Sequence, residues 1–196
     1  MIAYLDGKIT YKSPTHIHLD VGGIAYDVQL SLHSYGLLES LDKVKIYTQL
    51  IIRDDAHTLY GFMTEEEKNL FNKLISVSGI GPNTARVILS YMTPPDTTNA
   101  ILTDNVAAFK KVKGVGPKTA QRIILDLKDK LLKSAPDVGN LTSLSAPSIR
   151  DEAISALVAL GFQKNQVIKQ VDKVMSQESG IDQVETLIKS TLRQLS

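Results

Sequence analysis

The first 62 residues alternate between apolar and polar positions in short runs, with the period of two that is typical of β-strands. Gly22-Gly23 separates two of these runs and predicts a two-residue hairpin, because both central positions of such turns can need a positive φ. The five runs are rich in Val, Ile, Tyr and Thr: YLDGKITYK, HIHLDV, IAYDVQL, KVKIYTQLII and HTLYGF. Five strands within residues 1–63 predict a small barrel, for which an OB-fold and an SH3-like barrel both remain open.

At Thr64 the apolar period changes to that of a helix. Thr64 with Glu67 three residues later predicts a capping box, in which each side chain bonds the other residue's backbone N–H. Apolar positions then recur at helical spacing at Leu70, Phe71, Leu74 and Ile75. Further helical patterns, interrupted by turns with Gly and Pro, predict a helical domain over residues 64–133.

Residues 134–148 are poor in charge and rich in Ser, Pro, Gly and Ala, which predicts a flexible linker. Residues 149–196 then show three short amphipathic patterns that predict a three-helix bundle. A bundle of this length has a thin core. We therefore interpret it as a tethered docking module, with a purely structural appendage as the alternative.

The most informative motif is an internal repeat, because VSGIGPNTA at 77–85 recurs 35 residues later as VKGVGPKTA at 112–120. Each copy lies between two apolar helical stretches, so each predicts a helix, a Gly-x-Gly hairpin and a second helix. Pro82 and Pro117 fall at the first helical position, where a missing N–H costs nothing. A single copy could be a plain turn between helices, whereas two copies can hold two phosphates of one nucleic-acid backbone.

The hairpins have the chemistry of a phosphate site. Their glycines allow a sharp turn and a close backbone approach, and the free N–H groups at a helix N-terminus attract an anion. Such a site binds a phosphate and no base, so binding is expected to be independent of sequence. The candidate DNA contacts are Gly79, Gly81, Asn83, Thr84 and Arg86 in the first copy, and Gly114, Gly116, Lys118, Thr119 and Arg122 in the second.

Charge supports the second copy more strongly than the first. The formal net charge of the chain is only +1, but residues 109–133 hold eight Lys or Arg and two Asp, a local balance of +6. Asn83 stands where the second copy has Lys118, so we expect the first hairpin to rely more on backbone amides. A nucleotide-binding P-loop is not expected, because Pro117 stands where a P-loop needs Gly before the Lys.

Other compositional features exclude several function classes. The chain has no Cys, its four His are scattered along the sequence, and we expect no metal site and no cofactor. No run approaches the roughly 20 apolar residues that span a bilayer. No secretory signal is visible at the N-terminus, and we expect a cytoplasmic protein without a membrane partner.

One acidic pair, Asp54-Asp55, follows Arg53 in a predicted turn between two strands. Asp is common in turns because its side chain bonds the local backbone, so the pair could be structural only. A second hypothesis is a nuclease that holds Mg²⁺ with Asp54 and Asp55, with Asp6 as an optional third ligand. A third is a pure scaffold that binds proteins through the barrel and the C-terminal bundle.

The order of these motifs resembles the RuvA family, the Holliday-junction-recognition subunits of bacterial branch-migration complexes. The resemblance covers essentially the whole chain and rests on DGKI, VGGIAYDV at 21–28, RDDAHTLYGF, both hairpins and ALVALGF. It implies an α+β multidomain protein with an N-terminal OB-fold barrel, a central tandem helix-hairpin-helix domain and a C-terminal three-helix bundle. Two departures are an Asp-Asp pair where some members have Glu-Asp, and Asn83 where Lys is often found.

The resemblance also implies partners and roles. Members form homotetramers, one or two per junction, that hold four-way DNA open on a basic face and have no catalytic site of their own. Asp54 and Asp55 match an acidic pin at the centre of the junction. The C-terminal domain binds the hexameric AAA+ motor RuvB, and the resolvase RuvC acts on the same complex. Candidate motor-contacting or core residues are Leu157, Leu160 and Phe162.

Overall fold

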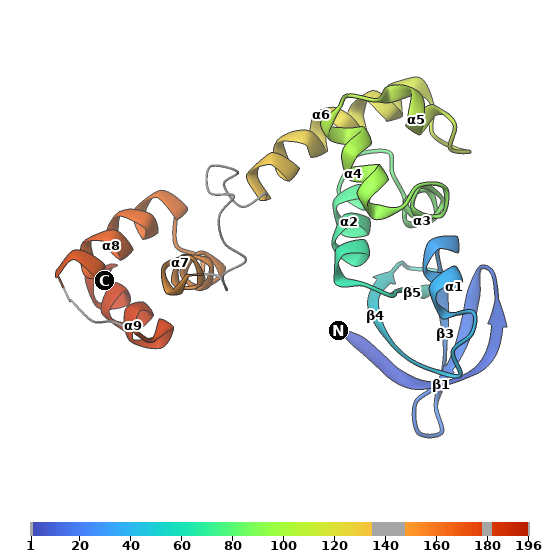
Figure 1. The fold of residues 1–196 in the computed structure, drawn as a ribbon, viewed down its shortest axis with the longest axis horizontal. Helices are drawn as coiled ribbons and strands as arrows, with labels where there is room; N and C mark the ends of the chain where they lie inside the picture. The colour runs from blue at the N-terminus through green and yellow to red at the C-terminus, as the bar shows by residue number, and fades with distance from the viewer. Residues whose placement is uncertain (1, 135–147, 178–181, 196) are drawn as a thin grey trace. The chain divides into compact units, whose positions relative to one another are not determined.

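The computed structural model describes residues 2–134, 148–177 and 182–195. The chain divides into two compact units, residues 1–136 and 137–196, and each is considered by itself. The first unit combines a barrel with a group of helices, and the second consists of helices (Figure 1). No helix in the described parts of the chain is long and apolar enough to cross a membrane.

Five strands close into a barrel in the order β1-β2-β3-β5-β4, with β4 pairing back to β1. Only β3 and β5 pair in parallel, and the other neighbours are antiparallel. The strands are β1 (Tyr4–Ser13), β2 (His16–Asp20), β3 (Ala25–Leu30), β4 (Lys43–Ile52) and β5 (His57–Phe62). The predicted five-stranded, OB-like barrel is confirmed.

The alternation seen in the sequence separates the inside of the barrel from its outside. Ile17, Leu19 and Val28 are fully buried, whereas His18 and Asp27, which alternate with them, are exposed. Gly22 and Gly23 adopt φ values of 68° and 98°, as the hairpin signal predicts. A short helix that was not predicted, α1 (Leu32–Leu38), lies between β3 and β4 and is only 7 residues long.

The helical half of the first unit contains both predicted hairpins. The first joins α2 (Glu65–Ile75) to α3 (Pro82–Tyr91), and the second joins α5 (Val106–Lys110) to α6 (Pro117–Ser134). α4 (Pro94–Leu102) connects the two pairs. These helices share one apolar core with the end of the barrel, where Phe71 packs against the rings of Tyr60 and Phe62 at centroid distances of 5.1 and 4.9 Å.

The predicted capping box at Thr64 is only half correct. The Thr64 hydroxyl accepts a hydrogen bond from the Glu67 N–H at 3.2 Å, which caps α2. The Glu67 side chain does not return this bond but is fully buried and accepts hydrogen bonds from the hydroxyls of Ser31 and Ser34 on α1. The prediction failed because α1, which supplies these two donors, is 33 and 36 residues away in the sequence.

The Glu67 contacts join the barrel to the helices through a closed set of hydrogen bonds. Ser31 caps α1 by accepting from the Ser34 N–H at 3.0 Å, and Ser34 also accepts from the Met63 N–H at 3.0 Å. Each buried hydroxyl therefore has both a donor and an acceptor partner. A buried carboxyl group that meets two hydroxyl donors avoids most of the cost of leaving water.

The second unit is a bundle of α7 (Ile149–Ala159), α8 (Lys164–Gln177) and α9 (Val184–Leu195). Its small core is built from Ala153, Ile154, Leu157, Val167, Val171, Val174 and Leu187. Gly161 has φ 98° in the turn after α7, a conformation that favours glycine. The linker predicted at 134–148 lies outside the described residues except at its two ends.

The Glu67 network gives a first testable prediction. Glu67→Ala should lower the free energy of unfolding of the first unit by about 3 kcal/mol, because it leaves two buried hydroxyls without their acceptor. Glu66→Ala, in the same helical turn but exposed, should cost less than about 1 kcal/mol. Urea unfolding followed by tyrosine fluorescence measures this, since all seven Tyr lie in the first unit and the chain has no Trp. Equal costs for the two variants would contradict the assignment.

Candidate functional site

The two hairpins have the same backbone conformation. Gly79 and Gly114 both have φ 89°, in the left-handed region that favours glycine. The second glycine of the first pair, Gly81, is the N-cap of α3 with an extended backbone at φ −85°. Of the two glycines in each hairpin, only the first takes a positive φ.

The middle residue of each hairpin anchors it to the core. Ile80 and Val115 are buried, and their N–H groups donate to the carbonyls of Val77 and Val112 at 3.0 and 3.1 Å. The remaining donors face away from the core. In the described part of the unit, no protein acceptor receives the N–H groups of Gly79, Gly81, Asn83 and Thr84, or of their counterparts Gly114, Gly116, Lys118 and Thr119.

The glycines also leave room for another molecule. A Cβ placed on Gly79, Gly114 or Gly116 would meet no atom within 4 Å. A phosphate can therefore approach these amides closely, at the N-termini of α3 and α6, where the helix dipole favours an anion. Thr84 and Thr119 are predicted to contact the same anion. Both residues are only half-buried, so their side chains are partly accessible to it.

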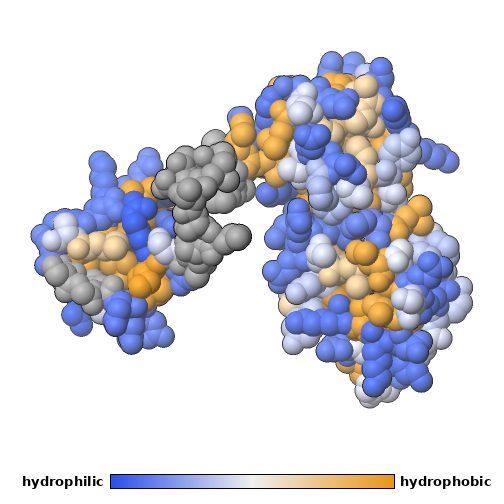
Figure 2. All heavy atoms as spheres, in the orientation of Figure 1, coloured by the Kyte–Doolittle hydropathy of each residue, from blue (hydrophilic) through white to orange (hydrophobic). Residues whose placement is uncertain are grey.

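Exposed lysines surround the second hairpin. Lys110, Lys111, Lys113 and Lys118 are all exposed, and Figure 2 shows hydrophilic side chains around α5 and the loop that follows it. Further along the basic segment, Lys128 forms an ion pair with Asp104, and Lys130 donates to the Ser76 hydroxyl at 3.0 Å. The four exposed lysines named above lie within or directly beside the hairpin.

Arg122 connects the two hairpins. Its guanidinium, on α6, donates to the carbonyl and the hydroxyl of Ser78 in the first hairpin at 3.3 and 3.4 Å. The two repeats, 35 residues apart in the sequence, therefore lie beside one another. Arg122 is exposed, so the same charge also remains available to a phosphate. Ser78 was not predicted from the sequence as a site residue. Its role as the acceptor for Arg122 is seen only in the structure.

Arg86, a predicted DNA contact, lies against the barrel. Its guanidinium donates to the Thr15 carbonyl at 3.2 Å and to Gln29 Oε1 at 2.9 Å, both on the barrel. Arg86 is half-buried and holds α3 against the β2–β3 region. We therefore interpret Arg86 mainly as a residue that positions the first hairpin.

Asn83 is oriented by a buried tyrosine. The Tyr60 hydroxyl donates to Asn83 Oδ1 at 3.3 Å, which leaves the Asn83 amide N–H groups for a ligand. Burial raises the pKa of Tyr60, and the nearby charges of Arg86 and Arg53 only partly oppose this. The phenol therefore stays protonated and remains a donor at neutral pH.

The acidic pair lies at an exposed turn next to the first hairpin. The Arg53 N–H donates to the Ala56 carbonyl at 2.9 Å and closes the turn around Asp54 and Asp55. Within the described residues, neither carboxylate has a hydrogen bond or an ion pair. Arg53 Nη2 lies 3.9 Å from where a Cβ on Gly81 would be, so the residue before the acidic pair brings a positive charge to the first hairpin.

The nuclease hypothesis names Asp6 as an optional third ligand, and the structure does not place Asp6 beside the acidic pair. Asp6 lies on β1 opposite Lys45 of β4. Among the described residues, the one group of three potential metal ligands consists of His16, His18 and Asp27. Two of the histidines that look scattered in the sequence are therefore neighbours in space, which sequence reasoning missed.

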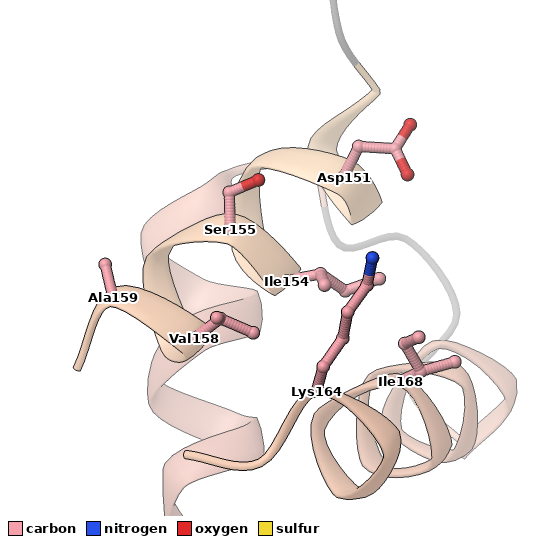
Figure 3. Close-up of a pocket in the computed structure, with 7 residues that line it drawn as sticks. All are labelled: Asp151, Ile154, Ser155, Val158, Ala159, Lys164 and Ile168. Atoms are coloured by element: carbon pink, nitrogen blue, oxygen red, sulfur yellow. The ribbon is translucent and has the colours of Figure 1, made fainter. Parts of the chain in front are cut away.

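The second unit offers a separate surface. Figure 3 shows a groove between α7 and α8 lined by Ile154, Val158 and Ile168, with Asp151 and Lys164 at its edge. Leu157 is fully buried in the bundle core, so it is not available to a partner. Leu160 is 64% exposed, and Phe162 is half-buried against the core. Of the three predicted partner residues, only Leu160 and Phe162 remain candidates for a contact surface.

Comparison with protein families matches three parts of the chain. Residues 1–61 match the RuvA N terminal domain, residues 71–129 the SAM-like helix-hairpin-helix tandem, and residues 148–196 the RuvA C-terminal domain. The matches follow one another in the order expected from the motifs.

Curated relatives are similar over the full length. A protein of Cytophaga hutchinsonii is 46% identical over 98% of this chain and 99% of its own, and one of Flavobacterium psychrophilum is 46% identical over 100% of both. A protein of Amoebophilus asiaticus is 47% identical over 98% of this chain and 100% of its own. Each is named Holliday junction branch migration complex subunit RuvA. The barrel, the paired hairpins and this full-length similarity together establish that the chain belongs to the RuvA family.

Proposed function

We propose that this chain binds four-way DNA junctions without sequence preference, as the non-catalytic DNA-binding subunit of a branch-migration complex. The observation that carries the proposal is the pair of equivalent hairpins, each with outward N–H groups at a helix N-terminus and open space in front of them. Two such anion sites joined by Arg122 suit two phosphates of one DNA backbone.

The acidic turn gives the proposal its junction specificity. A surface that binds duplex DNA gains nothing from two unpaired carboxylates beside a phosphate site. At the centre of a four-way junction, where strands separate, the same charges would repel phosphates and keep the crossover from settling on the basic surface. We therefore assign Asp54 and Asp55 as a pin, with Arg53 as the attractive partner next to it.

The second unit is proposed to recruit the motor. A hexameric ATPase of the RuvB type supplies the ATP hydrolysis that this chain lacks, and the α7–α8 groove with Leu160 is the candidate contact. Apolar side chains are visible on the surface of this unit, surrounded by hydrophilic ones (Figure 2). A groove lined by apolar side chains with charged residues beside them is typical of a protein-binding surface.

The proposed organisation follows the domains expected from the sequence. Residues 1–63 form the barrel with the pin, 64–133 the DNA-binding domain, 134–148 the linker and 149–196 the motor-binding domain. We propose that the chain acts in the cytoplasm of a bacterium as a homotetramer, one or two per junction, and that the resolvase RuvC acts on the same complex. A four-fold ring places eight carboxylates at its centre, two from each copy.

Lys118 tests the phosphate sites. Lys118→Ala should weaken junction binding equally for junctions of unrelated sequence, because the lysine contacts phosphate and no base. The slope of log affinity against log salt should fall by about 0.9 for each phosphate that the variant no longer neutralises. Fluorescence anisotropy with labelled junctions at several salt concentrations measures both quantities.

Lys128→Ala is the matched control for this test. It removes the same charge from the same helix, but Lys128 is already paired with Asp104. We expect its affinity and salt slope to stay close to those of the parent chain. A loss of affinity in Lys118→Ala that depended on sequence, or an equal loss in Lys128→Ala, would contradict the proposed phosphate surface.

The pin is tested by Asp54→Asn combined with Asp55→Asn. Neutral side chains of the same shape remove the repulsion, so the variant should bind junctions more tightly yet support slower branch migration by the motor. Binding to linear duplex should change less than binding to junctions. If both junction affinity and migration rate matched the parent, the pair would be a structural turn.

Leu160→Asp tests the partner surface. A charge at this exposed position should reduce binding of the RuvB-type motor at least about tenfold, since it disrupts an apolar contact without entering the core. Junction binding in the absence of the motor should not change, and an exposed substitution on α8, Lys169→Asp, serves as the control. Unchanged motor binding, measured by biolayer interferometry, would assign the contact elsewhere.

A further inference from the structure

The outer face of the barrel carries an ordered group of polar and aromatic side chains that the proposed DNA-binding function does not use. Strand pairing aligns Tyr11 of β1, His18 of β2 and Asp27 of β3 in one row across the sheet. The next row on the same face contains Ser13, His16 and Gln29. His16 and His18 point outward because Ile17 and Leu19, which alternate with them, are fully buried inside.

Three potential metal ligands converge on this face. One nitrogen from each histidine and one oxygen of Asp27 all lie within 4.8 Å of one another. Ligand atoms around a tetrahedral Zn²⁺ with bonds of about 2.1 Å are about 3.4 Å apart. Small side-chain rotations on a fixed pair of strands therefore suffice to bring the three atoms to one ion.

The surrounding contacts orient two of these ligands. His16 Nδ1 lies 3.0 Å from the Ser13 hydroxyl and 3.2 Å from the Thr15 hydroxyl. When a hydroxyl accepts the Nδ1 proton, Nε2 keeps the lone pair that a metal needs. Gln29 Nε2 donates to Asp27 Oδ1 at 3.3 Å. Metal-binding histidines and carboxylates are commonly held by such outer contacts.

Aromatic packing limits the movement of the histidine rings. Tyr11 lies against both of them, with centroid distances of 5.4 Å to His16 and 4.9 Å to His18. Restricting the free side chains in this way reduces the conformational entropy that binding a metal would otherwise cost.

We propose that His16, His18 and Asp27 form a site for a transition-metal cation, with Zn²⁺ as the physiological class of ion. Two imidazoles and one carboxylate suit Zn²⁺ and Cu²⁺ and disfavour Mg²⁺, which prefers oxygen ligands. The three ligands leave a fourth position open to water. The site is distinct from the hairpins and from the acidic turn.

The site is connected to the DNA-binding surface through two residues. Gln29 holds Asp27 with its amide N–H group and accepts from Arg86 with its oxygen. Thr15 contacts His16 with its hydroxyl and accepts from Arg86 with its carbonyl. A bound cation would therefore fix the two groups that hold Arg86 and, through it, the position of α3 and the first hairpin.

The experiment titrates the full-length chain, prepared without a polyhistidine tag, with Zn²⁺ alone in a calorimeter. We expect one Zn²⁺ per chain, and a loss of affinity of tenfold or more in each of His16→Gln, His18→Gln and Asp27→Asn. The matched controls are His33→Gln and His57→Gln, the other two of the four histidines, which should bind like the parent chain. Tyrosine fluorescence during thermal unfolding verifies that each variant is folded.

Electron paramagnetic resonance of the Cu²⁺-loaded chain gives a second, independent readout. The parent spectrum should show coupling to two imidazole nitrogens, and His16→Gln or His18→Gln should each reduce this to one. Ser13→Ala with Thr15→Ala should leave both nitrogens bound but weaken Zn²⁺ binding about tenfold, the usual effect of removing an outer hydrogen bond. Absence of stoichiometric Zn²⁺ binding, or equal losses of affinity in the control variants, would overturn the proposal.

Discussion

The buried hydrogen bonds of Glu67 are the constraint on which the geometry of the first unit depends. Glu67 lies in the first turn of α2 and accepts from two serines of α1, a helix inserted between barrel strands. One carboxyl group therefore joins the barrel to the helix that leads into the first hairpin. A buried polar group of this kind tolerates few alternative arrangements, because any shift leaves an unpaired donor or acceptor. The acidic turn and the hairpins are thus parts of one unit.

Three further hydrogen-bonded contacts also fix the hairpins in place. They distinguish residues that position the site from residues that face the ligand. Tyr60 holds Asn83, Arg86 holds the barrel, and Arg122 holds Ser78. Each contact links a hairpin to a residue that is distant in the sequence, either on the barrel or in the other hairpin. Among the described residues of the two hairpins, the outward-facing backbone amides and the exposed Lys118 have no protein partner and can bind phosphate without rearranging. This division accounts for a site that needs few specific side chains and still has a defined shape.

Much of the fold and part of the site could be predicted from local patterns. The strands, the hairpin repeat and the acidic turn have short-range signatures, namely alternation, Gly-x-Gly-Pro and an Asp pair. The actual partners of Glu67, the role of Arg86 and the grouping of His16, His18 and Asp27 all depend on strand register or on contacts between distant segments. Such pairings are set by packing in three dimensions, and no spacing in the sequence contains them.

The opposing charges near the first hairpin explain why this rigidity matters. Screening at physiological ionic strength weakens the interaction of exposed charges beyond about 8 Å. In the proposed pin role, Asp54 and Asp55 would therefore act only on phosphates that the hairpin amides and Arg53 had already brought close. If the turn and the hairpin moved independently, the two carboxylates would repel phosphates at no fixed position and would only weaken DNA binding. Because both are fixed to the same barrel strands and helices, attraction and repulsion apply at different, defined points of the bound DNA. Under the proposed function, a junction, whose strands separate at its centre, would satisfy both, whereas a continuous duplex would satisfy only the attraction.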